Sequence, residues 1–251
     1  MRPVVNALRR AVRAAGFDLV RVGAIPADLD DRDAAIIREV SPYTMTSVER
    51  LHALIGAVRY VCTARIPGSI VECGVWRGGS MMAAVRALRD AGEQSRDLYL
   101  YDTYEGMSAP TDRDVDPDGR TASALMQEQD VRVADSVWCY ASLEEVRANL
   151  RGTGYDPNRM HFVRGKVEET IPGSIPERIA VLRLDTDWYE STRHELVHLF
   201  PRLVAGGVLI IDDYGHWAGC RQAVDEYFAA HDVRLLLHRV DYSGRIAVKP
   251  A

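Results

Sequence analysis

From residue 69 onward, short apolar segments alternate with longer segments whose apolar residues recur at helical spacing. The short segments are rich in Val, Ile and Leu, which is typical of strands buried on both faces of a sheet. Strands separated by helices predict an α/β fold with a mostly parallel sheet. The turn sequence DYSG before the last strand predicts a closing hairpin, which makes one C-terminal strand antiparallel. We expect seven strands, at 69–74, 97–102, 160–165, 179–185, 206–212, 233–240 and 245–250.

The first sixty residues follow a different pattern. They read as amphipathic helices that break near Pro26 and Pro42. We therefore expect an N-terminal helical region over residues 1–60 and a main domain over residues 61–251.

A long polar segment at 103–140 connects the second and third predicted strands. It exceeds an ordinary connection, which predicts a lid-like or ligand-binding loop. Its acidic part, 112–118, imitates the start of a calcium loop, but Leu125 stands where a bidentate glutamate belongs. We therefore favour a solvated acidic loop over a calcium site.

Composition excludes several classes of function. The chain has 31 basic and 36 acidic residues, a net charge of −5, and no basic segment interleaved with aromatic residues, so we expect no nucleic-acid partner. No apolar run approaches the ~20 residues of a membrane span, and the N-terminus lacks the features of a secretory signal. Four scattered cysteines indicate reduced thiols. We expect a cytoplasmic protein without a membrane partner.

The segment VECGVWRGGS lies at the carboxyl end of the first predicted strand, where open parallel sheets bind ligands. Gly74, Gly78 and Gly79 allow a tight turn and close approach to the amides at a helix start. Their spacing differs from the GxGxxG of dinucleotide sites. With Asp102 placed to accept hydrogen bonds from a ribose, the pattern fits S-adenosylmethionine, whose amino group Glu72 could hold. The alternative is a tight turn without a ligand.

Two acidic pairs follow neighbouring strands: Asp185 with Asp187, and Asp212 with Asp213. If the strand conformation persists, Asp185 and Asp187 point the same way. Adjacent parallel strands lie ~4.8 Å apart, so Asp185, Asp212 and Asp213 can surround one point. Three carboxylates without sulfur or imidazole ligands suit a hard cation, magnesium first.

Five motifs, in this order, resemble the macrocin/mycinamicin O-methyltransferase family, whose members methylate deoxysugar hydroxyls of natural products. They are VECGVWRGGS, YDTYEGM, LRLDTDWYEST, LVAGGVLIIDDYG and CRQAVDEY. The resemblance covers roughly residues 40–232 and implies a Rossmann-like class I methyltransferase fold. It implies S-adenosylmethionine as cosubstrate and Asp185, Asp212 and Asp213 as Mg²⁺ ligands. The implied cofactor-binding residues are Thr46, Glu72, Gly74, Val75, Trp76, Ser80, Asp102, Gly165 and Asp185.

Asp187 is the acid left over from the metal set, and we assign it as the general base. A sugar hydroxyl is a poor nucleophile; a cation lowers its pKa and a nearby carboxylate can take its proton. Because the two sites use different strand ends, changing Gly74 or Asp102 is expected to weaken cofactor binding and to leave metal affinity nearly unchanged. The acceptor is a nucleotide deoxysugar or a glycosylated natural product, and the resemblance implies a homo-oligomer.

Four positions carry open alternatives. Lys166 follows Gly165 where family members often have an aromatic residue. Thr46 either contacts the methionine end of the cofactor or caps a helix, a role that Ser47 could also take. His216 and Trp217 either line the acceptor pocket or, for Trp217, pack in the core.

Two rival functions remain at this point. Asp185-Thr186-Asp187 is also a DxD motif, as found in metal-dependent glycosyltransferases that bind sugar nucleotides. That reading leaves the glycine segment and the second acidic pair unexplained. A non-catalytic S-adenosylmethionine-binding module would not require four aspartates at two strand ends.

Overall fold

The computed structural model describes residues 2–17, 25–131, 133 and 136–250. Residues 1 and 18–24 of the predicted helical region, residues 132, 134 and 135 of the predicted loop, and residue 251 lie outside the described residues.

Seven strands form one sheet in the order β3-β2-β1-β4-β5-β7-β6. The first five pair in parallel, whereas β7 is antiparallel to both β5 and β6. This confirms the predicted mostly parallel sheet with an antiparallel C-terminal strand. The strands are β1 Ser69–Cys73, β2 Leu98–Asp102, β3 Met160–Arg164, β4 Ile179–Leu184, β5 Leu203–Ile211, β6 His238–Arg239 and β7 Arg245–Val248.

Strand β6 is much shorter than the predicted segment 233–240. It pairs with β7 through only two residues, and Leu236 just before it is 87% exposed. Strand β6 lies at the edge of the sheet and pairs only with β7, so fewer contacts are available to bury its apolar residues. The apolar segment 233–240 therefore predicted a longer strand than the structure contains.

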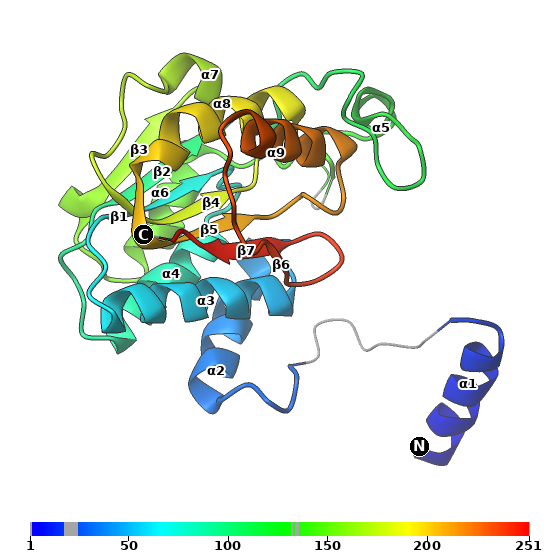
Figure 1. Ribbon diagram of the computed structural model, residues 1–251. Coiled ribbons are helices and arrows are strands. Elements are labelled where there is room, and N and C mark those ends of the chain that lie inside the picture. The colour runs from blue at the N-terminus through cyan, green and yellow to red at the C-terminus, as the bar shows by residue number, and fades with distance from the viewer. Residues whose placement is uncertain (1, 18–24, 132, 134–135, 251) are drawn as a thin grey trace.

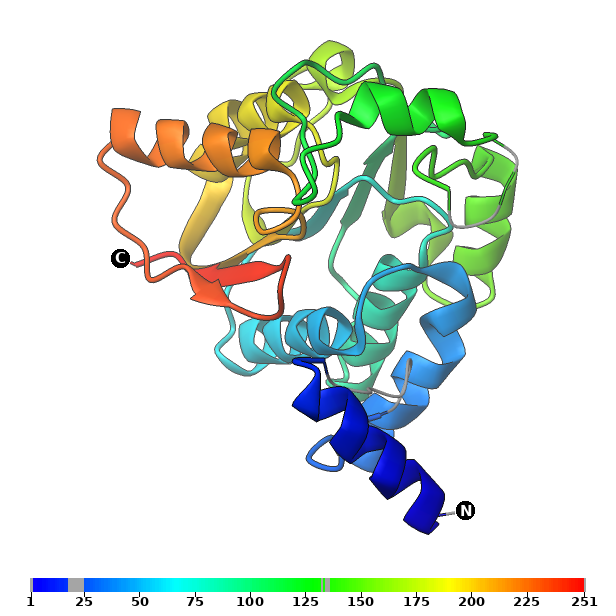
Figure 2. The same ribbon diagram turned by 90° about the vertical axis from the view of Figure 1, so that its right-hand side faces the viewer.

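Helices cover both faces of the sheet, as Figures 1 and 2 show. Alternation along β1 explains the two layers, because Ile70 packs in the core under α3 and α4 while Val71 packs in the core under α8 and α9. The described α-helices are α1 Arg2–Ala14, α2 Asp31–Val40, α3 Val48–Thr63, α4 Gly79–Asp90, α5 Ala122–Glu128, α6 Leu143–Arg151, α7 Val167–Thr170, α8 Tyr189–Leu199 and α9 Ala218–Ala230.

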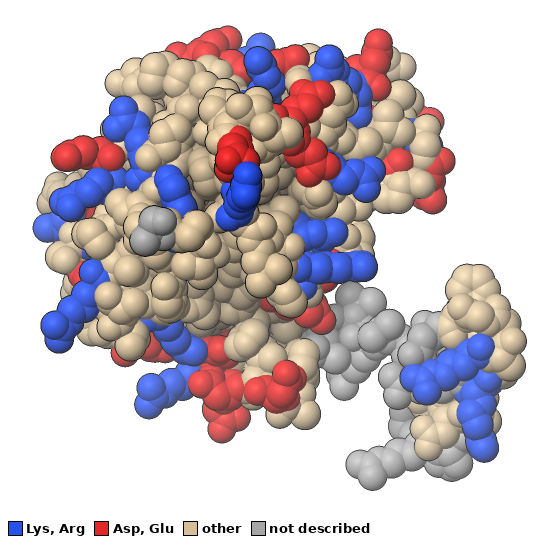
Figure 3. Space-filling model, in the orientation of Figure 1, with Lys and Arg blue, Asp and Glu red and all other residues tan. Residues whose placement is uncertain are grey.

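The N-terminal helices differ in how they pack. Helix α3 crosses residue 60, the predicted end of the helical region, and its Leu54 and Ile55 belong to the same core as the sheet. Helix α1 lies apart from the body in Figure 1. Basic and acidic side chains are interspersed over the face of the body in Figure 3, without a large patch of one sign. In the described part of the chain, no helix is long and apolar enough to cross a membrane.

The strand order reverses between β1 and β4, which opens a crevice at the carboxyl ends of the strands. Backbone hydrogen bonds continue the ladder one residue past each strand: Gly74 N–H donates to Tyr101, Asp185 N–H to Cys73 and Asp212 N–H to Leu184, each over 2.9 Å. Gly74, Asp185 and Asp212 therefore leave the sheet side by side.

The predicted loop is anchored at defined points. Asp114 is fully buried and accepts hydrogen bonds from the backbone N–H of Tyr189, at the start of α8, and of Thr111. Asp116 accepts hydrogen bonds from the backbone N–H groups of Asp118 and Arg120. The expectation of a solvated acidic loop is therefore wrong for Asp114 and Asp116, because loop and helix amides occupy their carboxylates.

Candidate active site

A cavity of about 400 Å³ lies at the carboxyl ends of the strands. This volume is in the range of small-molecule sites. With the exception of Glu72, every residue of the predicted site lines it: Thr46, Gly74, Val75, Trp76, Ser80, Asp102, Gly165, Asp185, Asp187, Asp212 and Asp213. Lys166, His216 and Trp217 line it as well.

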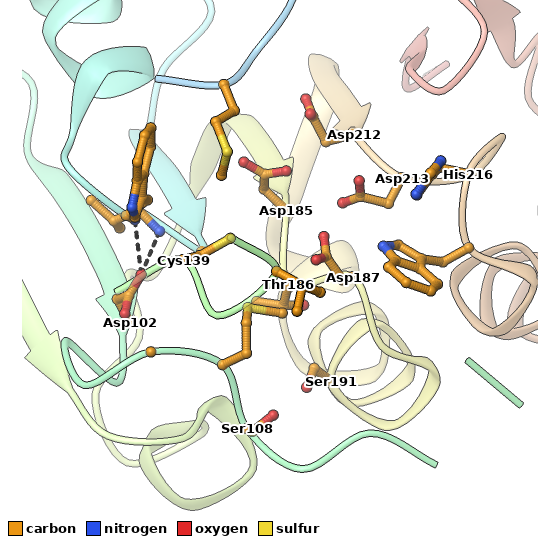
Figure 4. A pocket seen from close by; sticks show the side chains of 18 of the residues that line it. Asp102, Ser108, Cys139, Asp185, Thr186, Asp187, Ser191, Asp212, Asp213 and His216 are labelled. Atoms are coloured by element: carbon orange, nitrogen blue, oxygen red, sulfur yellow. Dashed lines mark hydrogen bonds between the residues drawn. The ribbon is translucent and has the colours of Figure 1, made fainter. Parts of the chain in front are cut away.

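Asp102 organises the glycine turn. Its Oδ2 accepts hydrogen bonds from the backbone N–H of Val75 at 2.7 Å and of Trp76 at 3.0 Å, shown as dashed lines in Figure 4. Its Oδ1 accepts one from the N–H of Tyr104. Burial raises the pKa of Asp102, and the three amides oppose that rise. Because Asp102 and Trp76 both line the cavity, the carboxylate can hold the turn and face a ligand.

Hydroxyl groups gather at the start of α4. Thr46 Oγ1 lies 3.2 Å from Ser80 Oγ, and Thr44 Oγ1 lies 2.8 Å from Thr46 Oγ1. Ser47, not Thr46, caps α3, because its hydroxyl accepts the N–H of Arg50. The helix-cap alternative for Thr46 is therefore wrong, and its side chain faces the cavity.

Glu72 lies beneath the cavity rather than in its wall. It is 2% exposed, and its Oε1 accepts a hydrogen bond from Arg183 at 2.7 Å. Its Oε2 has no hydrogen-bond partner among the described residues. Burial raises the pKa of Glu72 to about 7, and the charge of Arg183 works against that rise.

Three carboxylates meet at the other end of the cavity. Oxygens of Asp185, Asp187 and Asp213 lie within 4.8 Å of one another, and Figure 4 shows the side chains converging. Asp213 Oδ2 is buried without a hydrogen-bond partner in the described chain. An all-oxygen donor set with an unpartnered buried oxygen fits a hard divalent cation.

Asp212 is oriented differently from the other three aspartates. Its carboxylate pairs with Arg183, at 2.7 Å, and with Arg50. It lines the cavity but is not part of the close group. The structure therefore brings together two of the predicted metal ligands, Asp185 and Asp213, together with the predicted base.

Sequence reasoning missed the two arginines. Arg183 is 2% exposed and also pairs with Asp185 at 2.6 Å and donates to Thr46 at 2.9 Å. Arg50 also pairs with Asp241 at 3.0 Å. Arg183 interrupts an otherwise apolar buried strand, a signal that predicts a buried partner.

Asp187 has an environment suited to proton transfer. Burial, together with the neighbouring charges of Asp185 and Asp212, raises the pKa of Asp187 to about 7, and a hydrogen bond with Asp213 opposes that rise. Its φ of 66° shows that the extended conformation of β4 does not persist to this residue. Asp185 and Asp187 nevertheless reach the same point.

Aromatic residues close the acid end of the cavity. Trp217 lines it and also packs edge-on against Trp188, with ring centroids 5.0 Å apart. Its packing role is therefore confirmed, and its contact with an acceptor stays a prediction. His216 lines the cavity and packs near Tyr242. Burial lowers the pKa of His216.

Comparison with known proteins identifies the family. The model of the family described as Macrocin-O-methyltransferase (TylF) matches residues 11–248. The chain belongs to the macrocin O-methyltransferase family. This confirms the family that the five motifs indicated and makes the glycosyltransferase alternative wrong.

Individual relatives agree with the family. One is an 8-demethyl-8-(2,3-dimethoxy-alpha-L-rhamnosyl)-tetracenomycin-C 4'-O-methyltransferase of Streptomyces olivaceus, 36% identical over 80% of this chain and 74% of that protein. Another is the mycinamicin III 3''-O-methyltransferase of Micromonospora griseorubida, 33% identical over 80% of this chain and 76% of that protein. The solved structure of the O-methyltransferase NovP has a TM-score of 0.72 and 32% identity, over 83% of each chain.

These findings confirm the predicted class. The protein is an S-adenosylmethionine-dependent O-methyltransferase with the class I fold.

Proposed function

We propose that this methyltransferase transfers the methyl group of S-adenosylmethionine to a deoxysugar hydroxyl of a glycosylated natural product, with Asp187 as general base. The names of the relatives support this acceptor class, since one acts on a rhamnosyl-bearing tetracenomycin and another on mycinamicin III. The observation that carries the proposal is the acid cluster in the same cavity as the cofactor turn.

The charges around the acid cluster favour a glycoside over a nucleotide sugar. Three Lys and Arg residues line the cavity, and carboxylates neutralise the two arginines: Arg50 pairs with Asp212, and Arg120 pairs with Asp116 at 2.9 Å. The third residue, Lys166, lies directly before α7. A diphosphate would compete with those carboxylates for the arginines. The exposed rim residues Met45 and Tyr242, at 43% and 58% exposure, offer apolar surface to an aglycone.

The chemistry follows from the position and pKa of Asp187. A base with a pKa near the working pH combines an available carboxylate with useful proton affinity. Asp187 takes the hydroxyl proton while the acceptor oxygen bonds to the methyl carbon. The carbon–sulfur bond breaks with its electron pair on sulfur, which leaves neutral S-adenosylhomocysteine, the methyl ether and a protonated Asp187. The cavity walls supply much of the rate by aligning oxygen, carbon and sulfur.

The donor chemistry of the acid cluster supports Mg²⁺ as a second cofactor, held by Asp185, Asp212 and Asp213. A bound divalent cation would lower the pKa of the acceptor hydroxyl. Asp185 and Asp213 already lie in the cluster. Asp212 can join them only by giving up part of its pairing with Arg50 or Arg183.

The test is methyl transfer from isotope-labelled S-adenosylmethionine to one deoxysugar presented in two forms, as a macrolide or polyketide glycoside and as its nucleotide diphosphate. We expect labelled methyl ether on the glycoside, detected by mass spectrometry, and loss of the product with EDTA. Methylation of the nucleotide sugar alone would reverse the choice of acceptor. Full activity in EDTA would reject the proposed role of Mg²⁺.

We also place the enzyme in the cytoplasm and expect a homo-oligomer. The four cysteines are free thiols, which supports a reducing compartment. Helix α1 exposes Val5 and Leu8, and Phe17 beyond it is 72% exposed, which supports contact with a second copy. Light scattering of the full chain and of a variant with Val5, Leu8 and Phe17 changed to Ser tests this; equal masses would reject the role of these residues.

A further inference from the structure

Glu195, on α8, is a buried acid that the proposed reaction does not use. It is 0% exposed, and its Oε1 accepts a hydrogen bond from the Thr186 hydroxyl at 2.9 Å. Its Oε2 has no hydrogen-bond partner in the part of the chain that the structure describes. Burial raises the pKa of the Glu195 carboxyl well above its usual range.

The partner of Glu195 belongs to an unusual turn around Asp187. The Trp188 N–H donates to the Thr186 carbonyl over 2.7 Å, and Asp187 between them has a φ of 66°. A hydrogen bond from residue i+2 back to residue i, with a positive φ in the middle, defines the strained form of the γ-turn. Such strain persists only where the surroundings enforce the conformation.

The C-terminal side of this turn is fixed by the core. Trp188 is 1% exposed, and its indole N–H donates to the Ser108 carbonyl at 3.0 Å. The Tyr189 N–H donates to Asp114 at 2.8 Å. The N-terminal side has the contact between Thr186 and Glu195. Each side of Asp187 is thus held by a hydrogen bond to another element.

A carboxyl group at this depth has a cost that leucine would not have. Leucine fills a similar volume and requires no hydrogen bond, whereas a buried acid must be desolvated. What the acid adds is the oxygen that receives the Thr186 hydroxyl. Thr186 also lines the cavity, directly between Asp185 and Asp187.

We propose that Glu195 is a positioning residue, which holds the Thr186 hydroxyl and so keeps the γ-turn that presents Asp187 to the acceptor hydroxyl. This inference rests on the proposed role of Asp187 as the base. If the inference holds, Thr186 and Glu195 affect turnover through the hydrogen bond between them, and neither residue contacts the transferred methyl group.

The experiment uses the full-length enzyme with saturating S-adenosylmethionine and an accepted glycoside. Thr186→Val removes the hydroxyl with little change in shape, and we expect kcat to fall about tenfold, the scale of one lost hydrogen bond. KM for both substrates, and calorimetric affinities for S-adenosylhomocysteine and Mg²⁺, should stay within about threefold. Thr186→Ser restores the hydroxyl and should recover most of kcat.

The second partner is tested in parallel. Glu195→Leu should lower kcat as Thr186→Val does, and the double variant should show no further loss, because both changes remove one contact. Glu195→Gln keeps an acceptor oxygen and should retain more turnover than Glu195→Leu. The matched control is Thr192→Val, a buried threonine on the same helix that does not line the cavity; its kcat should equal that of the wild type.

Several results would overturn the inference. These are an unchanged kcat in Thr186→Val, a failure of Thr186→Ser to recover turnover, or additive losses in the double variant. A lower melting temperature with unchanged kcat would assign Glu195 a purely structural role. Asp187→Asn distinguishes failure of the proposed base from failure of the positioning role. If Asp187→Asn keeps full turnover, the assignment of Asp187 as the base fails. If Asp187→Asn is inactive while Thr186→Val has normal turnover, only the positioning role of Glu195 fails.

Discussion

Gly74 and Asp185 pack against each other through their backbones. A β carbon on Gly74 would stand 1.9 Å from the carbonyl oxygen of Asp185. Gly74 also has a φ of 81°, a conformation that other residues rarely adopt. The glycine turn, our proposed cofactor site, and Asp185, the first acid of the cluster, are thus packed directly against each other, although they follow different strands.

Gly74→Ala should therefore weaken both binding events. The added carbon must displace Asp185, so we expect the affinities for S-adenosylhomocysteine and for Mg²⁺ each to fall about tenfold or more, the scale of an overpacked core. This replaces the expectation from sequence that metal affinity stays unchanged. Calorimetry measures both, with Gly56→Ala in α3 as control because no atom lies within 4 Å of its added carbon. Intact Mg²⁺ affinity in Gly74→Ala would show that the sites are independent.

Asn variants of the four aspartates should respond differently when the initial rate is measured as a function of Mg²⁺ concentration. Asp185→Asn and Asp213→Asn should raise the Mg²⁺ concentration needed and recover part of the rate with excess metal. Asp187→Asn should lower turnover by ~10²-fold without recovery, as for a lost general base. Asp212→Asn tests whether an aspartate held by two arginines is a ligand. Recovery of Asp187→Asn by metal would make Asp187 a ligand and leave the base unassigned.

Arg183→Met should destabilise the fold. It removes the shared partner of Glu72, Asp185 and Asp212, which leaves the buried Glu72 without its ion-pair partner and leaves Asp212 with Arg50 alone. We expect the free energy of unfolding to fall by roughly 3 kcal/mol, as when one member of a buried pair is removed. Urea denaturation measures it, with Arg178→Met, exposed just before β4, as the control. Equal losses in the two variants would contradict a special role for Arg183.

Glu72 should make stability depend on pH. Its pKa of about 7 in the folded protein lies above the ordinary 4.5, so the folded state binds the proton more tightly than the unfolded state. Stability from this group is complete below pH 4.5 and is lost as the pH rises to about 7, by up to ~3 kcal/mol. Urea denaturation in metal-free buffer should show similar stabilities for wild type and Glu72→Gln below pH 4.5, and a growing advantage of Glu72→Gln as the pH rises to about 7. A constant difference between the two proteins over that range would contradict the role of Glu72.

The position of the site could be predicted from the sequence, but the ion pairs between its arginines and carboxylates could not. Parallel strands share one edge, so the ends at Gly74, Asp102 and Asp185 could be placed together without coordinates. The pairing of Arg50 with Asp212 joins residues far apart in the chain, and no local pattern encodes it. Arg183 was visible as a charge in a buried strand, but its partners were not.

The backbone conformation at Asp187 was also not predicted from the sequence. Thr-Asp-Trp does not specify a positive φ, because aspartate adopts one only occasionally and glycine, the usual signal, is absent. Asp114 and Asp116 were expected in solvent because acidic loops usually are. Their burial depends on tertiary contacts with α8 and with the loop itself.

Two segments from opposite ends of the chain meet beside the acid cluster. The Ser47 hydroxyl donates to Asp241 at 2.7 Å, and Arg50 joins the same carboxylate to Asp212. During synthesis, the strands from β1 to β5 leave the ribosome before the residue that ties them to α3. The contact between Asp241 and α3 therefore forms only after residue 241 has been made and has folded back beside the acid cluster.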